Sequence, residues 1–398
     1  MDQRASVDRL AELARLFFRL GLIGFGGPNA HIAMMEAEVV NRREWLTREQ
    51  FIDLIGATNL IPGPNSTEMA IHIGYVRAGW LGLIIAGVSF ISPAVLITVG
   101  LAWGYVKFGT MPQIAFLLYG IKPAVLGIIV DALWRLGQKA IKTSQLLTIF
   151  IGVILLVWFA HVNEITALLI GGVVGAIWLQ FPPQDPKSDK SAHLLVAGLM
   201  TGIALKASAT VIGLVKTSPV SLSQLGYSFL KIGGSLFGGG YVLLSLVQSE
   251  FVDGYGWLTQ PQLLDAISIG QLTPGPILAT ATFIGYVVAG IPGAIVATTA
   301  IFLPSFIFVA ATNPLIPRLR RSKWLAAFLD AVNASALGLM VVVTIQLALT
   351  TLGVPPQLDW LAVSIAISSA TLSIRFQVNS AWIVCGGAVI SQVAYFLR

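Results

Sequence analysis

Long apolar runs separated by short polar stretches dominate the chain. Residues 81–101 and 146–160 reach or approach the ~20 apolar residues that a bilayer-spanning helix requires. No segment alternates apolar and polar residues at period two, as the strands of a membrane barrel would. The first 21 residues predict an amphipathic helix, and we expect it in the mature protein because no small-residue cleavage site follows a clean apolar core. The pattern predicts an all-α integral membrane protein.

Composition narrows the function classes. Hydrophobic residues make up 56% of the 398 and charged residues 11%, whereas soluble proteins contain about 25% charged residues. The net charge of +6 comes from scattered basic residues, so we expect no nucleic-acid partner. The single cysteine, Cys385, excludes an internal disulfide and a thiolate metal cluster. Walker A, H-E-x-x-H and G-x-S-x-G motifs are absent, so we expect neither an enzyme nor a bound cofactor or metal.

An internal repeat organises the chain. FFRLGLIGFGGPN at 17–29 aligns with FLKIGGSLFGGGY at 229–241, a shift of 212 residues, and REWLT and IPGP find their matches GWLT and LTPGP at the same shift. One residue is then lost, and IGY at 73–75 matches IGY at 284–286. The sequence therefore predicts two homologous halves, 1–181 and 221–398. Residues 182–220 form a linker that contains PPQDPKSDK and one extra apolar segment, 194–215.

Loop charges predict that the two halves face opposite ways across the membrane. The first loop is basic in half one but carries no Lys or Arg in half two, and the next pair of loops reverses this difference; the basic residues are Arg42, Arg43 and Arg48, then Arg318, Arg320, Arg321 and Lys323. Because Lys and Arg collect on the cytoplasmic side, we expect inverted repeats with a cytoplasmic N-terminus. Inverted repeats are typical of secondary transporters, whose substrate site lies near the midplane.

Each half contains two helix breaks, GFGGPN at 24–29 and IPGPNS at 61–66 in half one, and LFGGGY at 236–241 and LTPGPI at 272–277 in half two. The flanking apolar stretches are too short to span ~30 Å at 1.5 Å per residue, which predicts re-entrant hairpins or broken helices. Helix N-termini after such breaks present unpaired N–H groups that suit an anion. Glycine and proline could instead serve close packing or kinks.

Polar side chains near the breaks are candidates for substrate contact. Asn65, Ser66 and Thr67 could contact an anion or cap the helix that follows. Half two has Ile277, Leu278 and Ala279 there, and Asn29 corresponds to Tyr241, so the expected site is lopsided. Glu68 suits proton coupling because a carboxylate at this position would oppose an anion unless it is protonated.

Three cations in apolar surroundings are further candidates, since an ionisable group at the membrane centre costs about 2.5 to 3.5 kcal/mol. They are Arg19, Lys122 and Lys231; Arg19 and Lys231 could instead extend to the interface. We expect Asp131 to lie nearer the surface. Other groups fit bland roles better: packing for His31 and His72, helix capping or salt bridges for Glu38, Asp53, Glu250 and Asp265, and an anchor at the end of its helix for Arg77.

The motifs FGGP, REWLT and PGP…IGY…G, with their second-half counterparts FGGGY, GWLT and TPGP…IGY…G, resemble the chromate ion transporter family in its long two-domain form. The resemblance covers both halves. It implies a secondary transporter of the bacterial inner membrane that exports chromate and confers resistance. The family's motif residues map to Gly26, Gly27, Pro28, Trp45, Pro62, Gly63 and Pro64, and to Gly238, Gly239, Trp257, Pro274, Gly275 and Pro276. FGGGY lacks the proline of FGGPN.

The expected substrate site therefore combines the breaks, including Gly240, with the cations and polar residues named above. Chromate and sulfate are tetrahedral dianions of similar size, so a sulfate or other oxyanion transporter is the near alternative. A membrane scaffold that transports nothing is the distant one. The expected partners are the oxyanion and the lipid bilayer, and the sequence is compatible with coupled protons and with an oligomer.

Overall fold

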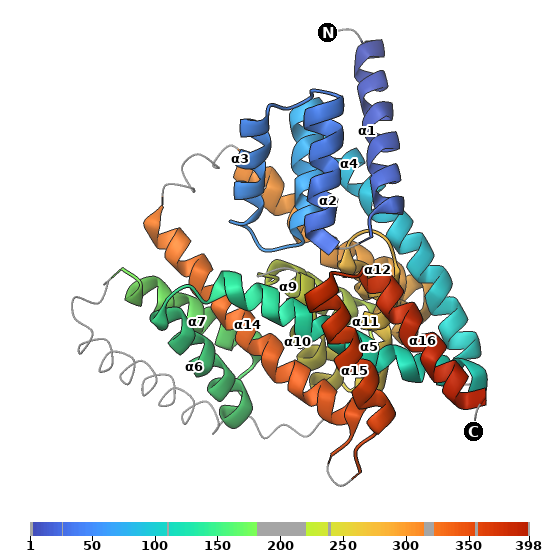
Figure 1. Cartoon of the computed structure of the whole chain (residues 1–398). Coiled ribbons are helices and arrows are strands. Elements are labelled where there is room, and N and C mark those ends of the chain that lie inside the picture. The colour runs from blue at the N-terminus through green and yellow to red at the C-terminus, as the bar shows by residue number, and fades with distance from the viewer. Residues whose placement is uncertain are drawn as a thin grey trace.

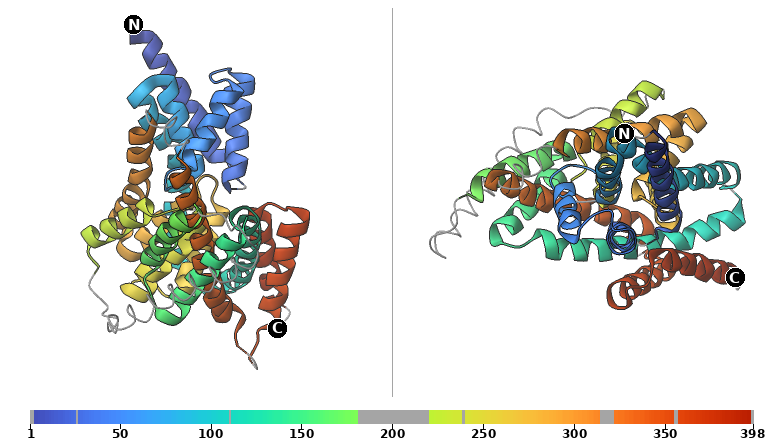
Figure 2. Two further views of the ribbon diagram at one scale, coloured as in Figure 1. Left: turned by 90° about the vertical axis from the view of Figure 1, so that its left-hand side faces the viewer. Right: turned by 90° about the horizontal axis from the view of Figure 1, so that it is seen from above.

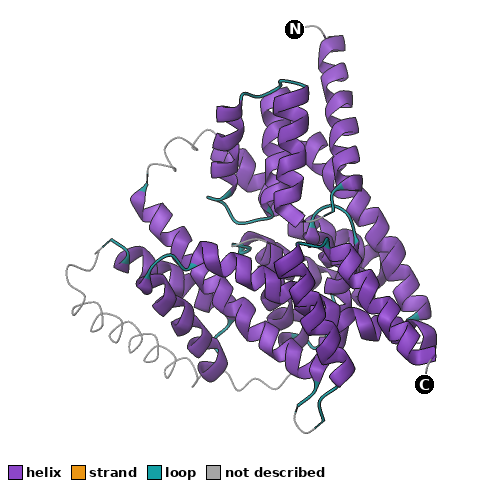
Figure 3. Cartoon of the chain, in the orientation of Figure 1, coloured by secondary structure: helices purple, strands orange, loops and turns teal. Residues whose placement is uncertain are grey.

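The computed structural model describes residues 3–25, 27–109, 111–180, 220–237, 240–313, 322–354 and 357–396. This part of the chain consists of helices joined by short loops, without a strand (Figure 3). Four helices within it are long and apolar enough to cross a membrane: Asn65–Phe108, Phe116–Ala140, Ile277–Thr312 and Lys323–Leu352. The prediction of an all-α membrane protein is confirmed. Segment 194–215 and the arginines at 318, 320 and 321 lie outside the described residues.

Half one contains seven α-helices and one π-helical turn among its described residues (Figure 1). They are α1 (Gln3–Ile23), α2 (Gly27–Glu36), the π-helical turn η1 (Ala37–Arg42), α3 (Arg48–Thr58), α4 (Asn65–Phe108), α5 (Pro112–Ala140), α6 (Ser144–Ala160) and α7 (Glu164–Trp178).

Half two repeats this order with more irregular short helices. Its elements are α9 (Leu222–Gly234), the 3-10 turn η3 (Gly240–Val242), α10 (Leu243–Val247), the π-helical turn η4 (Gln248–Gly254), α11 (Gln260–Leu272), the 3-10 turn η5 (Ile277–Ala279), α12 (Thr280–Thr312), α14 (Lys323–Leu352), α15 (Trp360–Phe376) and α16 (Ser380–Phe396).

Local detail in the two halves agrees as well. The Thr47 side chain caps α3 by accepting a hydrogen bond from the backbone N–H of Gln50. The Gln50 side chain accepts one from the backbone N–H of Thr47 in return, which makes a capping box. Thr259 and Gln262 form the same box at α11. A π-helical turn also lies a few residues before each of these helices, η1 before α3 and η4 before α11. The equivalent elements therefore begin and end with the same backbone devices.

Both α4 and α12 fold back on themselves as antiparallel helical hairpins. The backbone leaves helical geometry at Ala78 and Gly79 in α4, where Gly79 has a φ of 61°, and at Ala289 and Gly290 in α12, where Gly290 has a φ of 63°. A Cβ placed on Gly74 would lie 2.2 Å from the Gly82 carbonyl oxygen. Eight residues of straight helix would separate these positions by ~12 Å. The chain after each second break thus forms a short arm, a tight turn and a long arm.

The two halves are interlocked. The long helix α5 of half one packs against α15 and α16 of half two, while α14 packs against α6 and α7 of half one (Figures 1 and 2). Small residues permit these approaches: a Cβ on Gly127 would lie 2.6 Å from the Ala366 carbonyl oxygen, and one on Gly120 would lie 2.1 Å from that of Gly387. The largest apolar cluster accordingly mixes side chains from both halves. Neither half completes its packing alone.

Candidate functional site

The helix breaks of opposite halves meet in two reciprocal crossings. The Gly63 N–H donates to the Leu236 carbonyl oxygen at 2.9 Å, and the Gly275 N–H donates to the Gly24 carbonyl oxygen at 2.7 Å. Gly63 and Gly275 are repeat equivalents, as are Gly24 and Leu236. Non-helical backbone is tolerated at membrane depth only where it is satisfied by protein or lines a wet cavity. Here each repeat provides a carbonyl oxygen that accepts a hydrogen bond from the break of the other repeat. The N–H groups of Gly63 and Gly275 therefore already have hydrogen-bond partners within the protein.

The crossing at Gly63 is lined by polar side chains. A Cβ on Gly63 would lie 2.1 Å from Glu68 Oε1 and 2.5 Å from Ser305 Oγ, so both groups lie directly against the break. Glu68 is 0% exposed, and within the described part of the chain no hydrogen bond of ordinary geometry reaches its two carboxylate oxygens. The Thr67 hydroxyl and both ring nitrogens of His72 are also buried, and among the described residues they too have no hydrogen-bond partner of ordinary geometry. Half one therefore places buried, weakly satisfied polar groups beside its second break.

The crossing at Gly275 is apolar by comparison. A Cβ on Gly275 would face the Ala94 methyl group, and Ala94 is the repeat equivalent of Ser305. The Gly24 carbonyl oxygen here also accepts a bond from His31 Nε2 at 2.9 Å, and the His31 ring lies edge-on against Phe90. His31 thus fixes the backbone of the crossing, in agreement with its expected packing role.

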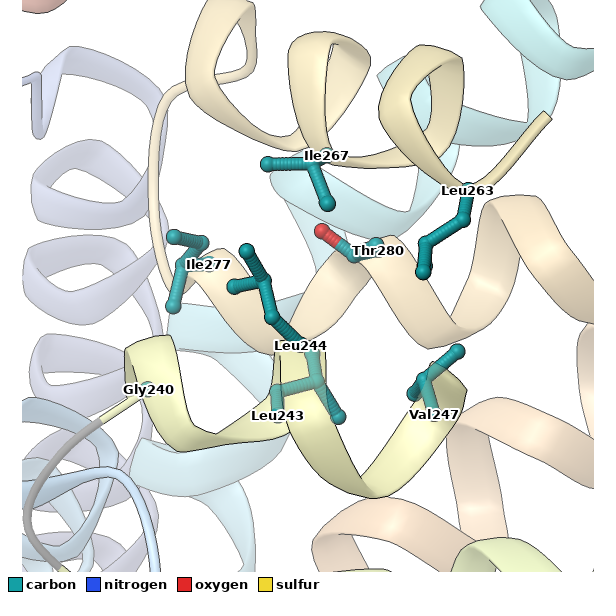
Figure 4. A pocket seen from close by; sticks show the side chains of 8 residues that line it. All are labelled: Gly240, Leu243, Leu244, Val247, Leu263, Ile267, Ile277 and Thr280. Atoms are coloured by element: carbon teal, nitrogen blue, oxygen red, sulfur yellow. The ribbon is translucent and has the colours of Figure 1, made fainter. Parts of the chain in front are cut away.

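A small cavity lies within half two, between η3, α10, α11 and the start of α12 (Figure 4). Its volume of about 10 Å³ is close to the minimum for one water molecule. Aliphatic side chains surround it, and the one oxygen among the side chains drawn is the Thr280 hydroxyl. The lining residues are Gly240, Leu243, Leu244, Val247, Leu263, Ile267, Ile277 and Thr280. This cavity is too small and too apolar to hold a tetrahedral dianion.

Lys122 forms an ion pair that joins the two halves. Its Nζ lies 3.3 Å from Asp265 Oδ1, and the Tyr105 hydroxyl donates to Asp265 Oδ2 at 2.9 Å. The Asp265 side chain is 4% exposed and the Lys122 side chain 23%. Asp265 precedes Pro274 by nine residues, most of them in α11, which places the ion pair about 13 Å along the chain from the break.

The other two candidate cations lie elsewhere. Lys231 Nζ pairs with Glu250 Oε2 at 2.6 Å, and Glu250 Oε1 accepts from Ser228 at 3.1 Å. Arg19 is exposed on α1. The structure therefore does not gather the three cations at one place, and Lys122 is the one paired with the opposite half.

In half one the equivalent of Glu250 is also ion-paired. Glu38 bonds to Arg42 at 3.0 Å and to Arg43 at 3.2 Å. Arg43 continues to Glu12 at 2.6 Å, and Arg77 reaches Glu12 at 3.3 Å. The salt-bridge interpretation of Glu38 and Glu250 is confirmed.

Comparison with known proteins decides the family. The family model described as Chromate transporter matches residues 11–176 and again 223–392. The chain belongs to the chromate transporter family. Among its relatives, the chromate transport protein of Cupriavidus metallidurans is 32% identical over 97% of this chain and 93% of its own length. The chromate transport protein of Pseudomonas aeruginosa is 32% identical over 92% and 86%. The probable chromate transport protein of Synechococcus elongatus is 29% identical over 83% and 82%. No solved structure matches the chain.

Most of the family's motif residues that the structure describes are buried at the helix breaks. Pro62, Gly63 and Pro64 are buried, as are Pro274, Gly275 and Pro276, while Gly27 has a φ of 79° at the start of α2 and Pro28 follows it half-buried. Trp45 lies under the guanidinium groups of Arg77 and Arg43, with ring-centroid distances of 4.7 and 5.3 Å. Trp257 stacks on Tyr255. Gly26, Gly238 and Gly239 lie outside the described residues, as does the side chain of Tyr241.

The structure contradicts the capping alternative for residues 65–67 and the expected position of Asp131. Asn65, Ser66 and Thr67 do not cap α4 through their side chains, because Pro64 occupies the N-cap position and the Asn65 amide donates to Asn59 Oδ1 at 2.8 Å. Asp131 does not lie near the surface. It is 4% exposed, because it bonds to Arg135 and receives the Ser373 hydroxyl from α15.

Sequence reasoning missed the partners of the candidate residues more than the residues themselves. The salt-bridge role expected for Asp265 is confirmed, but the sequence does not identify Lys122 as its partner, and it singles out neither Tyr105 nor Ser305. One available signal was that Asp265 is the acid of LLDAISIG, an otherwise apolar stretch that leads into the LTPGP break. Asn29, in contrast, is exposed on α2.

Proposed function

We propose that this chain is a secondary transporter that exports chromate across the bacterial plasma membrane, with no catalytic activity of its own. The observation that supports this most directly is the pair of reciprocal crossings at Gly63 and Gly275, because broken helices that meet between two repeats are the usual setting of a transporter site. The relatives named as chromate transport proteins, which cover most of the chain, support the substrate class.

The anion site in this proposal draws on half one. The N-terminus of α4 begins directly after the buried Pro64 and carries no side-chain cap, so its positive dipole end favours an anion. The Thr67 and Glu68 N–H groups donate to the Pro64 carbonyl oxygen, so the N–H groups for an anion are those of residues 65 and 66.

Lys122 supplies a positive charge in the apolar first part of α5, between Ile114 and Val130. The remaining break residues supply the shape of the site through close backbone packing. We assign Arg19 and Lys231 to attraction of the anion toward the protein.

Glu68 is the proposed coupling group. A fully buried carboxylate without ordinary hydrogen bonds is strongly disfavoured, and its negative charge beside the break would repel a dianion. We therefore propose that Glu68 carries a proton while the anion is bound. Proton coupling is not required energetically, because exporting two negative charges from a negative-inside cell releases about 4.6 kcal/mol per 100 mV.

Chromate uptake into everted membrane vesicles tests the proposal. Vesicles with and without the protein are held at a set membrane potential, with sulfate as competitor. The expected result is potential-driven chromate accumulation that is lost in Lys122→Ala. Lys107→Ala is the matched control, since Lys107 is an exposed lysine that stacks on Trp103 and Phe108 near the end of α4.

The outcomes separate the alternatives. Inhibition by sulfate at concentrations similar to those of chromate would indicate a general oxyanion transporter. No uptake above the control vesicles, with the protein shown to be folded and inserted, would exclude chromate transport. A scaffold would leave flux unchanged in Lys122→Ala and alter partner binding instead.

A further inference from the structure

The ion pair between Lys122 and Asp265 is specific to one side of the pseudo-symmetric fold. The repeat equivalent of Lys122 is Asn333, and the equivalent of Asp265 is Asp53, an exposed residue on α3. Half one thus contributes the cation and half two the anion, whereas the mirrored residues are an asparagine and an aspartate, which cannot form an ion pair with each other. A contact that were needed only to hold the two halves together would be equally useful at both positions.

The geometry of the pair favours exchange of the anionic partner. Within the described part of the chain, Asp265 Oδ1 accepts no hydrogen bond of ordinary geometry, so Lys122 holds it at 3.3 Å mainly by charge. The other oxygen, Oδ2, is held separately by Tyr105. The Lys122 side chain is 23% exposed against 4% for Asp265, so Lys122 is the more accessible partner of the pair. Asp265 can therefore leave Lys122 while Tyr105 retains it.

Charge balance determines what must accompany anion binding. In the structure the ammonium and the carboxylate cancel, so the pair is neutral. A dianion bound to Lys122 beside an ionised Asp265 would leave two uncompensated negative charges in a poorly hydrated site. Uptake of one proton by Asp265 halves that excess.

On the basis of the function proposed above, we infer that Asp265 and the transported oxyanion compete for Lys122. The anion displaces the Asp265 carboxylate from the ammonium group, and Asp265 binds one proton from the aqueous phase. Departure of the anion returns the proton to water and restores the ion pair. Asp265 is thus a coupling residue for transport, in addition to Glu68 at the break.

The groups that act on this carboxyl are few. Among the described residues, Lys122 from α5 and Tyr105 from α4 are the titratable groups that face Asp265. The other elements that pack against α11 are α10, η4, η5, α12, α14 and α16; η4 carries Glu250 and Asp253, and neither acts measurably on the Asp265 carboxyl. A pH dependence of anion affinity that follows Asp265 is therefore assigned to this triad.

The test compares the pH dependence of the chromate KM in everted vesicles for the wild type and Asp265→Asn. In the wild type the KM is expected to fall as the pH is lowered. In Asp265→Asn the competing charge is gone, so the KM at neutral pH is expected to fall about tenfold, and the part of its pH dependence that comes from Asp265 is expected to disappear. Asp131→Asn is the matched control, because it removes a second buried, ion-paired carboxylate that lies on α5.

Tyr105→Phe gives an independent readout if Asp265→Asn fails to insert. It removes only the hydrogen bond that stabilises the carboxylate, so the midpoint of the pH dependence is expected to move to higher pH by about one unit. Asp265→Glu, which keeps a carboxyl group at this position, is expected to show the pH dependence that Asp265→Asn lacks. A wild-type pH profile in Asp265→Asn or in Tyr105→Phe would overturn the inference while leaving chromate transport intact. Absence of uptake in the wild type would overturn the proposed function itself.

Discussion

Gly63 carries several constraints at a single residue. Its N–H reaches the opposite repeat, its φ of 150° is rarely adopted by other residues, and its open side faces Glu68 and Ser305. The equivalent Gly275 has a φ of 90° but meets a methyl group at 3.0 Å. The glycine of half one is therefore the less replaceable of the two, although both belong to the same motif.

Gly63→Ala is expected to lower the free energy of unfolding by about 2 to 4 kcal/mol, since the added methyl group overlaps two polar atoms in a strained backbone conformation. Gly100→Ala is the control, because nothing lies within 4 Å of its open side and it sits in a helix with ordinary dihedrals. Thermal unfolding of the purified protein in detergent measures both. Equal melting temperatures for the two variants would contradict the crowded geometry at Gly63.

His31→Leu tests the second crossing by installing the residue that half two has at the equivalent position, Leu243. The Gly24 carbonyl oxygen would lose one of its two donors but keep the Gly275 N–H. We expect a modest loss of about 1 kcal/mol in the free energy of unfolding and no change in chromate flux. The same unfolding assay and the vesicle assay measure these effects. A large loss of flux would show that His31 acts on the substrate rather than on the backbone.

The sequence indicated where the candidate residues lie but not which of them meet. Glu68 lies in the first helical turn after the PGPN break, so its position beside the crossing could be predicted. The contacts of Asp265 with Lys122 and Tyr105 could not, because these residues come from different helices whose contacts depend on how the halves interlock. Asp131 illustrates the same difficulty: its burial comes from α15, a helix of the other half.

At the scale of elements, the repeat is expressed in paired local devices. The capping boxes of α3 and α11 and the hairpin turns of α4 and α12 occur at equivalent positions. The helix breaks were predictable because Gly and Pro interrupt apolar sequence. The reversal at Gly79 was not, because an isolated glycine in an apolar run is also compatible with a straight helix.

Thr47→Ala and Thr259→Ala are expected to have similar effects, because each removes the side-chain acceptor of one capping box. Loss of such a cap costs about 1 kcal/mol. The two single variants and the double variant can be compared by thermal unfolding in detergent. Since the boxes lie in different halves, the double variant should show the sum of the two losses; a markedly larger loss would mean that the caps are coupled.

At the scale of the whole molecule, the loop charges predict opposite orientations for equivalent loops. Asn41→Cys and Asp253→Cys place a thiol at repeat-equivalent, exposed positions in a Cys385→Ser background. An impermeant maleimide is expected to label one variant in everted vesicles and the other in intact spheroplasts. Labelling of both from the same side would contradict the inverted arrangement.

The interlocked packing also has a consequence for biosynthesis. Helix α15 begins 220 residues after α5 ends, yet α5 packs against it and against α16. Most of the first half is therefore inserted long before its lateral partners leave the ribosome. Contacts so distant in sequence form late and slowly. During synthesis, the face of α5 that carries Gly120 and Gly127 is therefore exposed to lipid in the bilayer. It becomes covered only when about the last forty residues, which form α15 and α16, have been translated.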